Sequence, residues 1–250
     1  MPRIILAIFA LLAPLRAEWI FSNAETLAAP AGIDFIRRPA SDGKRSVELH
    51  VVIFRAKAHT FAVMDNPDGA FDLGNASAKR GALAAVNGGY FHPDRTPLGL
   101  VVRQGATLHP LERAKLLSGL VVVKKDRIAL LRTGEFRASP DVREALQAGP
   151  FLVEAGKAVA GLNDTRSAAR TVVFADGAGR FGVLTCKSAT LAETARILAT
   201  QGLLPEGKIT RALNLDGGSS TALWVKREPS PFYSREWNGV RNYLAIVPRQ

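Results

Sequence analysis

The sequence predicts an α+β fold, with a single domain of mostly antiparallel strands and a few helices. Many short apolar segments alternate with polar residues, and turns rich in Gly, Pro, Asn and Asp separate them. Few segments show the spacing of an amphipathic helix. The 250 residues are 47% hydrophobic and 22% charged, which is the composition of a globular chain with one sizeable core.

Residues 1–17 have the pattern of a signal peptide. Arg3 precedes an apolar run, residues 4–13, which is too short to span a bilayer, and Ala17 offers a small residue for cleavage. We expect the mature protein to be periplasmic or secreted, with cleavage after Ala17. The alternative is a buried N-terminal helix. No later apolar run predicts an integral membrane segment after removal of the signal.

Residues 18–45 are predicted to be an N-terminal extension, because they carry few regular signals beyond a short strand near residues 19–21. The main domain is predicted over residues 46–250. It opens with a clear strand, Ser46–Arg55, in which Val47, Leu49, Val51 and Ile53 share one face.

Further strands follow from alternation and turn chemistry. We expect strands at residues 60–64, 82–86, 149–153 and 240–247, and hairpins that join 98–103 to 107–108, 118–123 to 127–131 and 170–175 to 180–186. A loop is expected at residues 65–69, a polar loop at 162–168 and another at 226–238.

Three helices are predicted. One covers residues 75–80 and ends at Gly81, and another covers residues 190–201 with an apolar side. The third covers residues 139–148, because Ser139 suits an N-cap, Pro140 suits the first helical position and Gly149 follows the end.

The composition also excludes several classes of site. Cys186 is the only cysteine and lies in an apolar run, which excludes a disulfide framework and a cysteine zinc cluster. The four histidines have no metal-ligand spacing. The net charge of +11 favours anionic partners. No nucleic-acid-binding motif accompanies this charge, so we expect no nucleic-acid partner.

The most informative stretch is residues 212–225. Two apolar runs enclose Asn214, Asp216, the pair Gly217-Gly218 and three hydroxyl residues, Ser219, Ser220 and Thr221. Glycines let a ligand approach the main chain and leave N–H groups free for an anion. This pattern is typical of a phosphate or sugar site. The alternative is a β-hairpin with an ordinary Gly-Gly turn and a solvated aspartate.

A second motif, Asn87-Gly88-Gly89-Tyr90-Phe91, follows the strand predicted at residues 82–86. An asparagine again precedes a glycine pair at the end of an apolar strand. The two aromatic residues favour a pocket wall where a ring stacks on a sugar. A core Tyr-Phe pair that packs a loop explains the residues equally well.

These motifs resemble the phosphodiester glycosidase family. Five segments occur in the family's order, namely Asn87 to Phe91, Gly149-Pro150, Ala169-Arg170-Thr171, Asn214 to Thr221 and Arg241-Asn242. The resemblance covers roughly residues 46–248, and bacterial relatives are often labelled exopolysaccharide biosynthesis proteins. Two departures concern the shape of the pocket. Ser219 stands where a third glycine is common, and Thr171-Val172-Val173-Phe174 stands where Thr-Ala-Ile-Gly is common.

The resemblance implies hydrolysis of a sugar-1-phosphodiester, with a phosphorylated glycan or sugar phosphate as substrate. Asp216 and Arg170 would be catalytic, with the carboxylate assisting water or a cationic sugar and the guanidinium holding phosphate. Substrate-binding residues would be Asn87, Gly88, Gly89, Tyr90, Phe91, Asn214, Gly217, Gly218, Ser219, Ser220, Thr221, Arg241 and Asn242.

Several alternatives stay open at this point. Arg170 also suits a surface strand, Arg241 also suits an ion pair with an acidic neighbour, and Glu154 or Asp164 also suits a second carboxylate. The residues require no cofactor and leave a divalent metal open. A non-catalytic protein that binds carbohydrate or anionic polymer in exopolysaccharide assembly is the main competing function. A serine hydrolase is disfavoured, since no G-x-S-x-G elbow is present.

Overall fold

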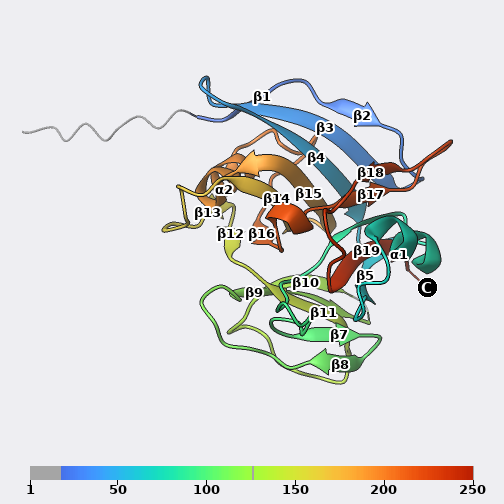
Figure 1. The fold of residues 1–250 in the computed structure, drawn as a ribbon. Helices are drawn as coiled ribbons and strands as arrows, with labels where there is room; N and C mark the ends of the chain where they lie inside the picture. Colours follow the sequence, from blue (N-terminus) through green and yellow to red (C-terminus); the bar gives the residue numbers. More distant parts are fainter. Residues whose placement is uncertain (1–17, 126, 250) are drawn as a thin grey trace, which may run out of the picture.

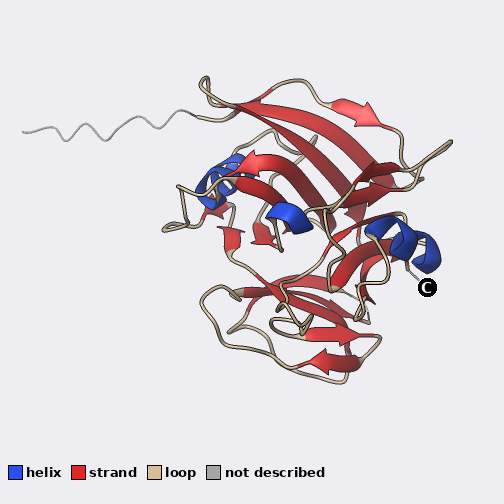
Figure 2. Ribbon diagram, in the orientation of Figure 1, coloured by secondary structure: helices blue, strands red, loops and turns tan. Residues whose placement is uncertain are grey.

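The structure is a computed structural model that describes residues 18–125 and 127–249, so the predicted signal peptide lies outside the described residues. Three antiparallel sheets pack around a shared core in a single domain (Figure 1). Strands dominate, and the described residues contain two α-helices (Figure 2). The antiparallel single domain is therefore confirmed. The α+β class is corrected to mostly β, because one of the three predicted helices is a strand.

The largest sheet forms one side of the molecule. Its hydrogen-bonded order is β1-β3-β4-β15-β14-β16-β12-β13, with β2 beside β3. The strands are β1 (Ile20–Phe21), β2 (Glu25–Leu27), β3 (Ile33–Ser41), β4 (Ser46–Arg55), β12 (Phe151–Glu154), β13 (Lys157–Ala158), β14 (Ala168–Ala175), β15 (Arg180–Ala189) and β16 (Arg211–Asn214). The predicted hairpin between β14 and β15 is confirmed.

The two smaller sheets have five strands each. One has the order β10-β9-β11-β7-β8, with β7 (Val101–Arg103), β8 (Ala106–His109), β9 (Gly119–Lys124), β10 (Ile128–Arg132) and β11 (Val142–Ala148). The other has the order β18-β17-β6-β19-β5, with β5 (His59–Asp65), β6 (Ala84–Asn87), β17 (Leu223–Val225), β18 (Phe232–Ser234) and β19 (Asn242–Pro248).

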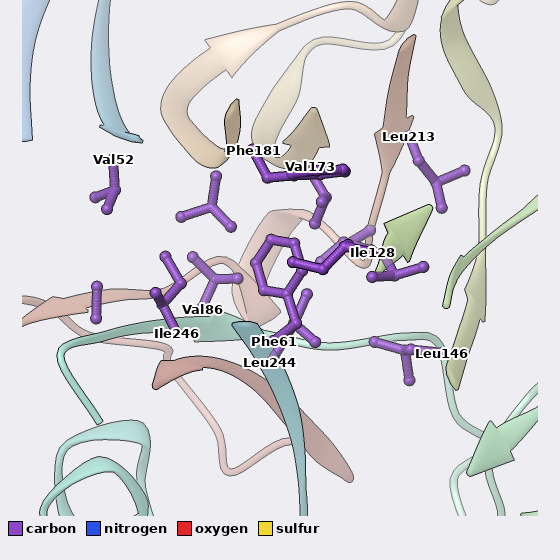
Figure 3. Close-up of a cluster of buried hydrophobic side chains, with 14 of the residues drawn as sticks. Val52, Phe61, Val86, Ile128, Leu146, Val173, Phe181, Leu213, Leu244 and Ile246 are labelled. Carbon is purple, nitrogen blue, oxygen red and sulfur yellow. The ribbon is translucent and has the colours of Figure 1, made fainter. Parts of the chain in front are cut away.

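The central core lies where the three sheets face one another (Figure 3). Each sheet contributes apolar side chains to it, among them Val52 and Val173 from the large sheet, Leu146 from β11, and Phe61, Val86 and Ile246 from the third sheet. On the other face of β4, Val47, Leu49, Val51 and Ile53 pack in a second cluster, as the alternation predicts. Burial on both faces fixes the register of β4, because a slip of one residue would exchange its two faces.

Two predicted helices are confirmed. Helix α1 (Leu73–Arg80) ends at Gly81, whose φ of +68° is the left-handed conformation that glycine favours. Helix α2 (Leu191–Ala199) begins with a capping box between Thr190 and Glu193 and packs against the outer face of the large sheet. In the described residues, neither helix has the length and hydropathy that crossing a membrane requires.

The helix predicted at residues 139–148 is wrong, because this segment forms strand β11 between β7 and β9. Its Glu, Ala, Leu and Gln residues favour a helix locally, but tertiary contacts override that preference. The Glu144 carboxylate accepts the N–H groups of Val63 and Gln104, and the Gln147 amide accepts that of Leu100. These side chains bond to neighbouring strands and loops, which a helix at this place would not reach.

Several strands were not predicted, and β3 and β18 are two of them. Residues 33–41, within the segment expected to be an N-terminal extension, form β3, which pairs along its full length with β4. Its sequence contains Arg37-Arg38-Pro39, which obscures the alternation. Strand β18 lies inside the polar loop predicted at residues 226–238 and pairs with β17.

Residues 212–225 do not form a hairpin. The strand before the motif, β16, belongs to the large sheet, and the strand after it, β17, belongs to the sheet of β6 and β19. The segment Leu215 to Ala222 therefore crosses between two sheets. A short 3₁₀ helix, η1 (Gly218–Ser220), lies within this crossing.

Candidate active site

A cavity of about 430 Å³ lies at the crossing between the two sheets. The backbone joins the sheets there, since Asp216 N–H donates to the Gly88 carbonyl over 3.1 Å. The residues that line the cavity come from five segments and are Tyr90, Leu116, Asn163, Arg166, Ala168, Arg170, Leu191, Asn214, Asp216, Gly217 and Gly218. Both sequence motifs therefore contribute to one concave site.

Asp216 lies in this cavity and is half-buried. Its Oδ1 accepts the Gly217 N–H over 2.8 Å. Burial raises the pKa of the Asp216 carboxyl above its usual range, and hydrogen bonds from Ser220 and Gly217 partly oppose that rise. The side chain is thus a carboxylate of increased basicity that faces the space where a ligand would bind.

Arg170 approaches the same cavity from β14 and is buried, with an exposed fraction of 9%. Its Nε donates to the Ala189 carbonyl over 2.8 Å and its Nη2 to the Arg166 carbonyl over 2.7 Å. No ion pair links it to a carboxylate within the described ranges 18–125 and 127–249. Burial lowers the pKa of the guanidinium. Neutral carbonyls hold this cation in place, which leaves its charge available to an anion.

Tyr90 and Asn214 form a hydrogen-bonded wall. The Tyr90 hydroxyl donates to the Gly149 carbonyl over 2.5 Å and accepts from Asn214 Nδ2 over 3.0 Å. Asn214 Nδ2 also donates to the Gly149 carbonyl over 3.0 Å. Burial and the nearby Asp216 carboxylate raise the pKa of Tyr90, so it stays a neutral donor. The network fixes the aromatic ring at the cavity surface.

Asn87 lies behind the cavity and is fully buried. Its Nδ2 donates to the Asp216 carbonyl over 2.8 Å, and its Oδ1 accepts from Thr171 Oγ1 over 2.6 Å and from the Ala222 N–H over 3.1 Å. A single amide thus joins the two motifs to β14. Its position supports the site from within the protein, away from the ligand space.

Two of the motif glycines lie so close to neighbouring atoms that no side chain would fit. A Cβ on Gly88 would lie 2.0 Å from Asn242 Oδ1, and a Cβ on Gly217 would lie 2.7 Å from the Ala169 carbonyl oxygen. Asn242 is fully buried, and its Oδ1 accepts the Gly89 N–H over 2.8 Å. A Cβ at Gly88 would press on β19, and one at Gly217 would press on β14, the strand that carries Arg170.

The predicted site residues therefore fall into groups. Six line the cavity, namely Tyr90, Arg170, Asn214, Asp216, Gly217 and Gly218. Four form its buried support, namely Asn87, Gly88, Gly89 and Asn242. Ser219, Ser220 and Thr221 continue the Asp216 loop without lining the cavity, and of these the side chain of Ser220 bonds to Asp216.

Phe91 and Arg241 are placed elsewhere. Phe91 packs against the cluster beneath α1, and the Arg95 guanidinium lies over its ring. Arg241 forms an ion pair with Asp65, as the alternative for this residue anticipated. Glu154 pairs with Arg132, and neither Glu154 nor Asp164 lines the cavity.

Five cavity residues escaped the sequence analysis as site candidates, namely Leu116, Asn163, Arg166, Ala168 and Leu191. Asn163 and Arg166 come from the loop predicted at residues 162–168, whose polar composition was its only signal. Leu116 and Leu191 add apolar surface, and Leu116 is 46% exposed. No local pattern marks these leucines, because the fold alone brings their segments to the cavity.

The cavity offers few protein ligands to a divalent metal. Within residues 18–125 and 127–249, no three His, Cys, Asp or Glu side chains gather in a metal-binding cluster. Asp216 supplies the one carboxylate among the described residues that line the cavity. Hard cations such as Ca²⁺ take six to eight oxygen ligands, usually with more than one carboxylate.

Comparisons with known proteins identify a family and a fold. The family model for phosphodiester glycosidase matches residues 80–247. The zebrafish N-acetylglucosamine-1-phosphodiester alpha-N-acetylglucosaminidase catalytic domain, auto-inhibited by its pro-peptide, superposes with a TM-score of 0.65 at 16% identity, covering 92% of this chain and 88% of that one. A hypothetical protein from Synechocystis superposes with a TM-score of 0.63 at 16% identity, covering 91% of this chain and 64% of that one.

At these identities the two structures establish the fold alone. A search of curated proteins by sequence finds no match. The matched range of the family model contains both Asn-plus-Gly-Gly motifs, Arg170 and Asp216, and it spans more than half of the chain. This chain belongs to the phosphodiester glycosidase family.

Proposed function

We propose that this chain is an exported hydrolase that cleaves a sugar-1-phosphodiester in envelope or extracellular glycans. The observation that carries the proposal is the placement of Asp216 and Arg170 in one cavity. The carboxylate has a raised pKa, and the guanidinium is held by carbonyls with no carboxylate partner in the described chain. Such a pair suits an anionic substrate, because the guanidinium can bind the phosphate charge while the carboxylate acts at the neighbouring sugar carbon.

Arg170 would bind the phosphate of the substrate. Its planar fork matches two phosphate oxygens, and burial in a low-dielectric site strengthens that attraction. Gly217 and Gly218 line the same cavity, so backbone comes close to the ligand there. An exposed lysine would provide charge but no fixed geometry.

Asp216 would act at the sugar carbon that is bonded to the phosphate. The leaving group of a glycosyl phosphodiester is a stabilised phosphate anion, so it needs less protonation than the alcohol of an ordinary glycoside. One carboxylate then suffices to deprotonate water or to stabilise a cationic sugar centre. A raised pKa makes Asp216 a stronger base than a solvated aspartate.

The walls of the cavity suit the sugar itself. Tyr90 presents an aromatic ring whose hydroxyl is already bonded, and Leu116 and Leu191 add apolar surface. Ligand pockets of this kind combine apolar walls with a few fixed polar groups.

The competing function is non-catalytic binding of a carbohydrate or anionic polymer in exopolysaccharide assembly. The net charge of +11 favours it as much as it favours a hydrolase. It would use Arg170 but would not require Asp216. A serine hydrolase gains no support, because none of the described residues that line the cavity is a histidine.

Turnover by purified residues 18–250 tests the proposal. UDP-N-acetylglucosamine and a panel of sugar-1-phosphodiesters are the substrates, and Asp216→Asn is assayed beside the wild type. We expect sugar release by the wild type alone. Absence of release across the panel, with saturable binding of an anionic glycan that is equal in the variant, would establish the binding function instead.

The export prediction has its own test. N-terminal sequencing of the protein from the periplasmic or culture fraction is expected to begin at Glu18. Recovery of the chain with Met1 intact in the cytoplasmic fraction would contradict it.

A further inference from the structure

Trp237 is the most exposed large apolar side chain among the described residues, with 87% of its surface exposed. The other two tryptophans, Trp19 and Trp224, are buried, with exposed fractions of 3% and 7%. Leaving an indole in water forgoes the stabilisation that its burial would supply. A site that keeps such a residue exposed is a candidate for ligand contact.

The loop that presents Trp237 is held on both sides. Glu236 is buried, and its carboxylate accepts from Leu73 N–H over 2.7 Å, from Tyr243 over 2.9 Å and from Tyr233 over 3.0 Å. On the other side, the Arg95 guanidinium donates to the Gly239 carbonyl over 3.1 Å. The backbone of Trp237 is therefore fixed, and its exposure is a feature of an anchored loop.

One further hydrogen bond ties this loop to the active site. The Trp237 N–H donates to the Ser219 carbonyl over 2.9 Å. Ser219 follows Gly218, which lines the cavity, and the same short segment contains Asp216. Trp237 thus lies beside the rim of the cavity without lining it.

We propose that Trp237 is an outer subsite that stacks on the pyranose ring of the acceptor sugar, the unit on the far side of the phosphate. This inference rests on the proposed function. The cavity of about 430 Å³ is at the small end of ligand pockets, and the reacting sugar with its phosphate occupies it. The next unit extends from the phosphate toward the rim, where the backbone of Trp237 is bonded to Ser219.

The chemistry of the rim agrees with a sugar. An indole offers a flat apolar face to the C–H groups of a pyranose and an N–H at its edge. Two exposed polar residues lie at the hydrogen bond between Trp237 and Ser219, namely Ser219 itself and Asn238, which follows Trp237. They offer a hydroxyl and an amide to the sugar hydroxyls. A purely lipidic partner would meet these polar groups without satisfying them.

Kinetics with two substrates test the subsite. The first joins glucose-1-phosphate to the 6-hydroxyl of a glucoside, and the second joins it to methanol. For the glucoside substrate, we expect Trp237→Ala to raise KM about tenfold. For the methyl substrate, which lacks the outer ring, we expect KM and kcat to stay unchanged. Trp237→Phe is expected to restore most of the loss. Ile20→Ala, at a 71% exposed side chain on β1, is the matched control.

A binding measurement separates this proposal from the proposed function. The three indole N–H signals in a nitrogen–proton NMR spectrum are assigned with Trp237→Phe, and the glucosyl phosphodiester is titrated into Asp216→Asn protein. We expect the Trp237 signal to shift with the sugar phosphodiester and to stay in place with inorganic phosphate. This measurement detects binding, so it tests the subsite even if the wild type shows no turnover.

Three outcomes would overturn the subsite. The first is an equal rise in KM for both substrates with Trp237→Ala, which would indicate a structural role. The second is an unchanged KM for the glucoside substrate. The third is a Trp237 signal that stays unmoved at saturating phosphodiester while the other signals shift.

Discussion

Asn87 Nδ2 donates to the backbone carbonyl of Asp216 over 2.8 Å, although Asn87 ends β6 and Asp216 follows β16, a strand of a different sheet. The same amide accepts bonds from Thr171 and Ala222. The loop that contains Asp216 is therefore held by a buried side chain from the first Asn-Gly-Gly motif. Because the amide satisfies three partners at once, loss of it leaves several buried polar groups unpaired.

Asn87→Ala is expected to lower the free energy of unfolding by roughly 2–4 kcal/mol, since it removes three buried hydrogen bonds and opens a small void. Urea denaturation followed by circular dichroism measures the change. Asn75→Ala, at an exposed position of α1, is the control and is expected to stay within about 0.5 kcal/mol of the wild type. Equal stability of the two variants would contradict a supporting role for Asn87.

Asp216→Asn is expected to abolish sugar release while thermal unfolding shows no loss of stability. The pKa of this carboxyl is raised by burial, so above the usual value of 3.8 the folded state binds more protons than the unfolded state. The Asp216 contribution to stability therefore falls as pH rises through the raised pKa. The Asn variant lacks this loss, and its Tm relative to the wild type is expected to increase as pH rises from 3.8 through the raised pKa of Asp216.

The same shift predicts the pH profile of activity. If Asp216 acts as a base, kcat/KM is expected to rise with pH through its raised pKa and then level off. Rates of sugar release measured in buffers of constant ionic strength provide the profile. A rate that falls with pH over this range would show that the protonated carboxyl is the active form.

Arg170→Lys is expected to reduce kcat/KM by about 10²–10³-fold, because an ammonium cannot reproduce the fork that faces the phosphate. The loss is expected to shrink for a substrate analogue with an uncharged linkage. Arg211→Lys is the control, since Arg211 pairs with Glu135 and does not line the cavity. Unchanged turnover by the Arg170 variant would remove this residue from the proposed site.

Gly88→Ala is expected to destabilise the fold by about 1–3 kcal/mol, because the new Cβ would lie 2.0 Å from Asn242 Oδ1. Gly134→Ala is the matched control, since a Cβ there meets nothing within 4 Å. Differential scanning of both variants measures the effect. If the Gly88 and Gly134 variants had the same Tm, the ends of β6 and β19 could separate without loss of stability.

Much of the fold follows from local patterns. The alternation of Val47, Leu49, Val51 and Ile53 predicts both the strand and its buried face, and Gly81 marks the end of α1. Residues 139–148 show where this approach fails. Their capping signals and helix-forming residues suit a helix, but the Glu144 and Gln147 side chains bond to neighbouring segments that only the folded chain brings near.

The sequence by itself determined the motif residues of the site, because Asn87 to Tyr90 and Asn214 to Gly218 are adjacent in the chain and their chemistry is local. The tertiary structure alone decided their roles. It placed Arg170 in the cavity, paired Arg241 with Asp65, turned Phe91 toward α1 and brought Leu116 and Leu191 to the rim. The physical reason is that these outcomes depend on contacts between distant segments, which sheet pairing and core packing set.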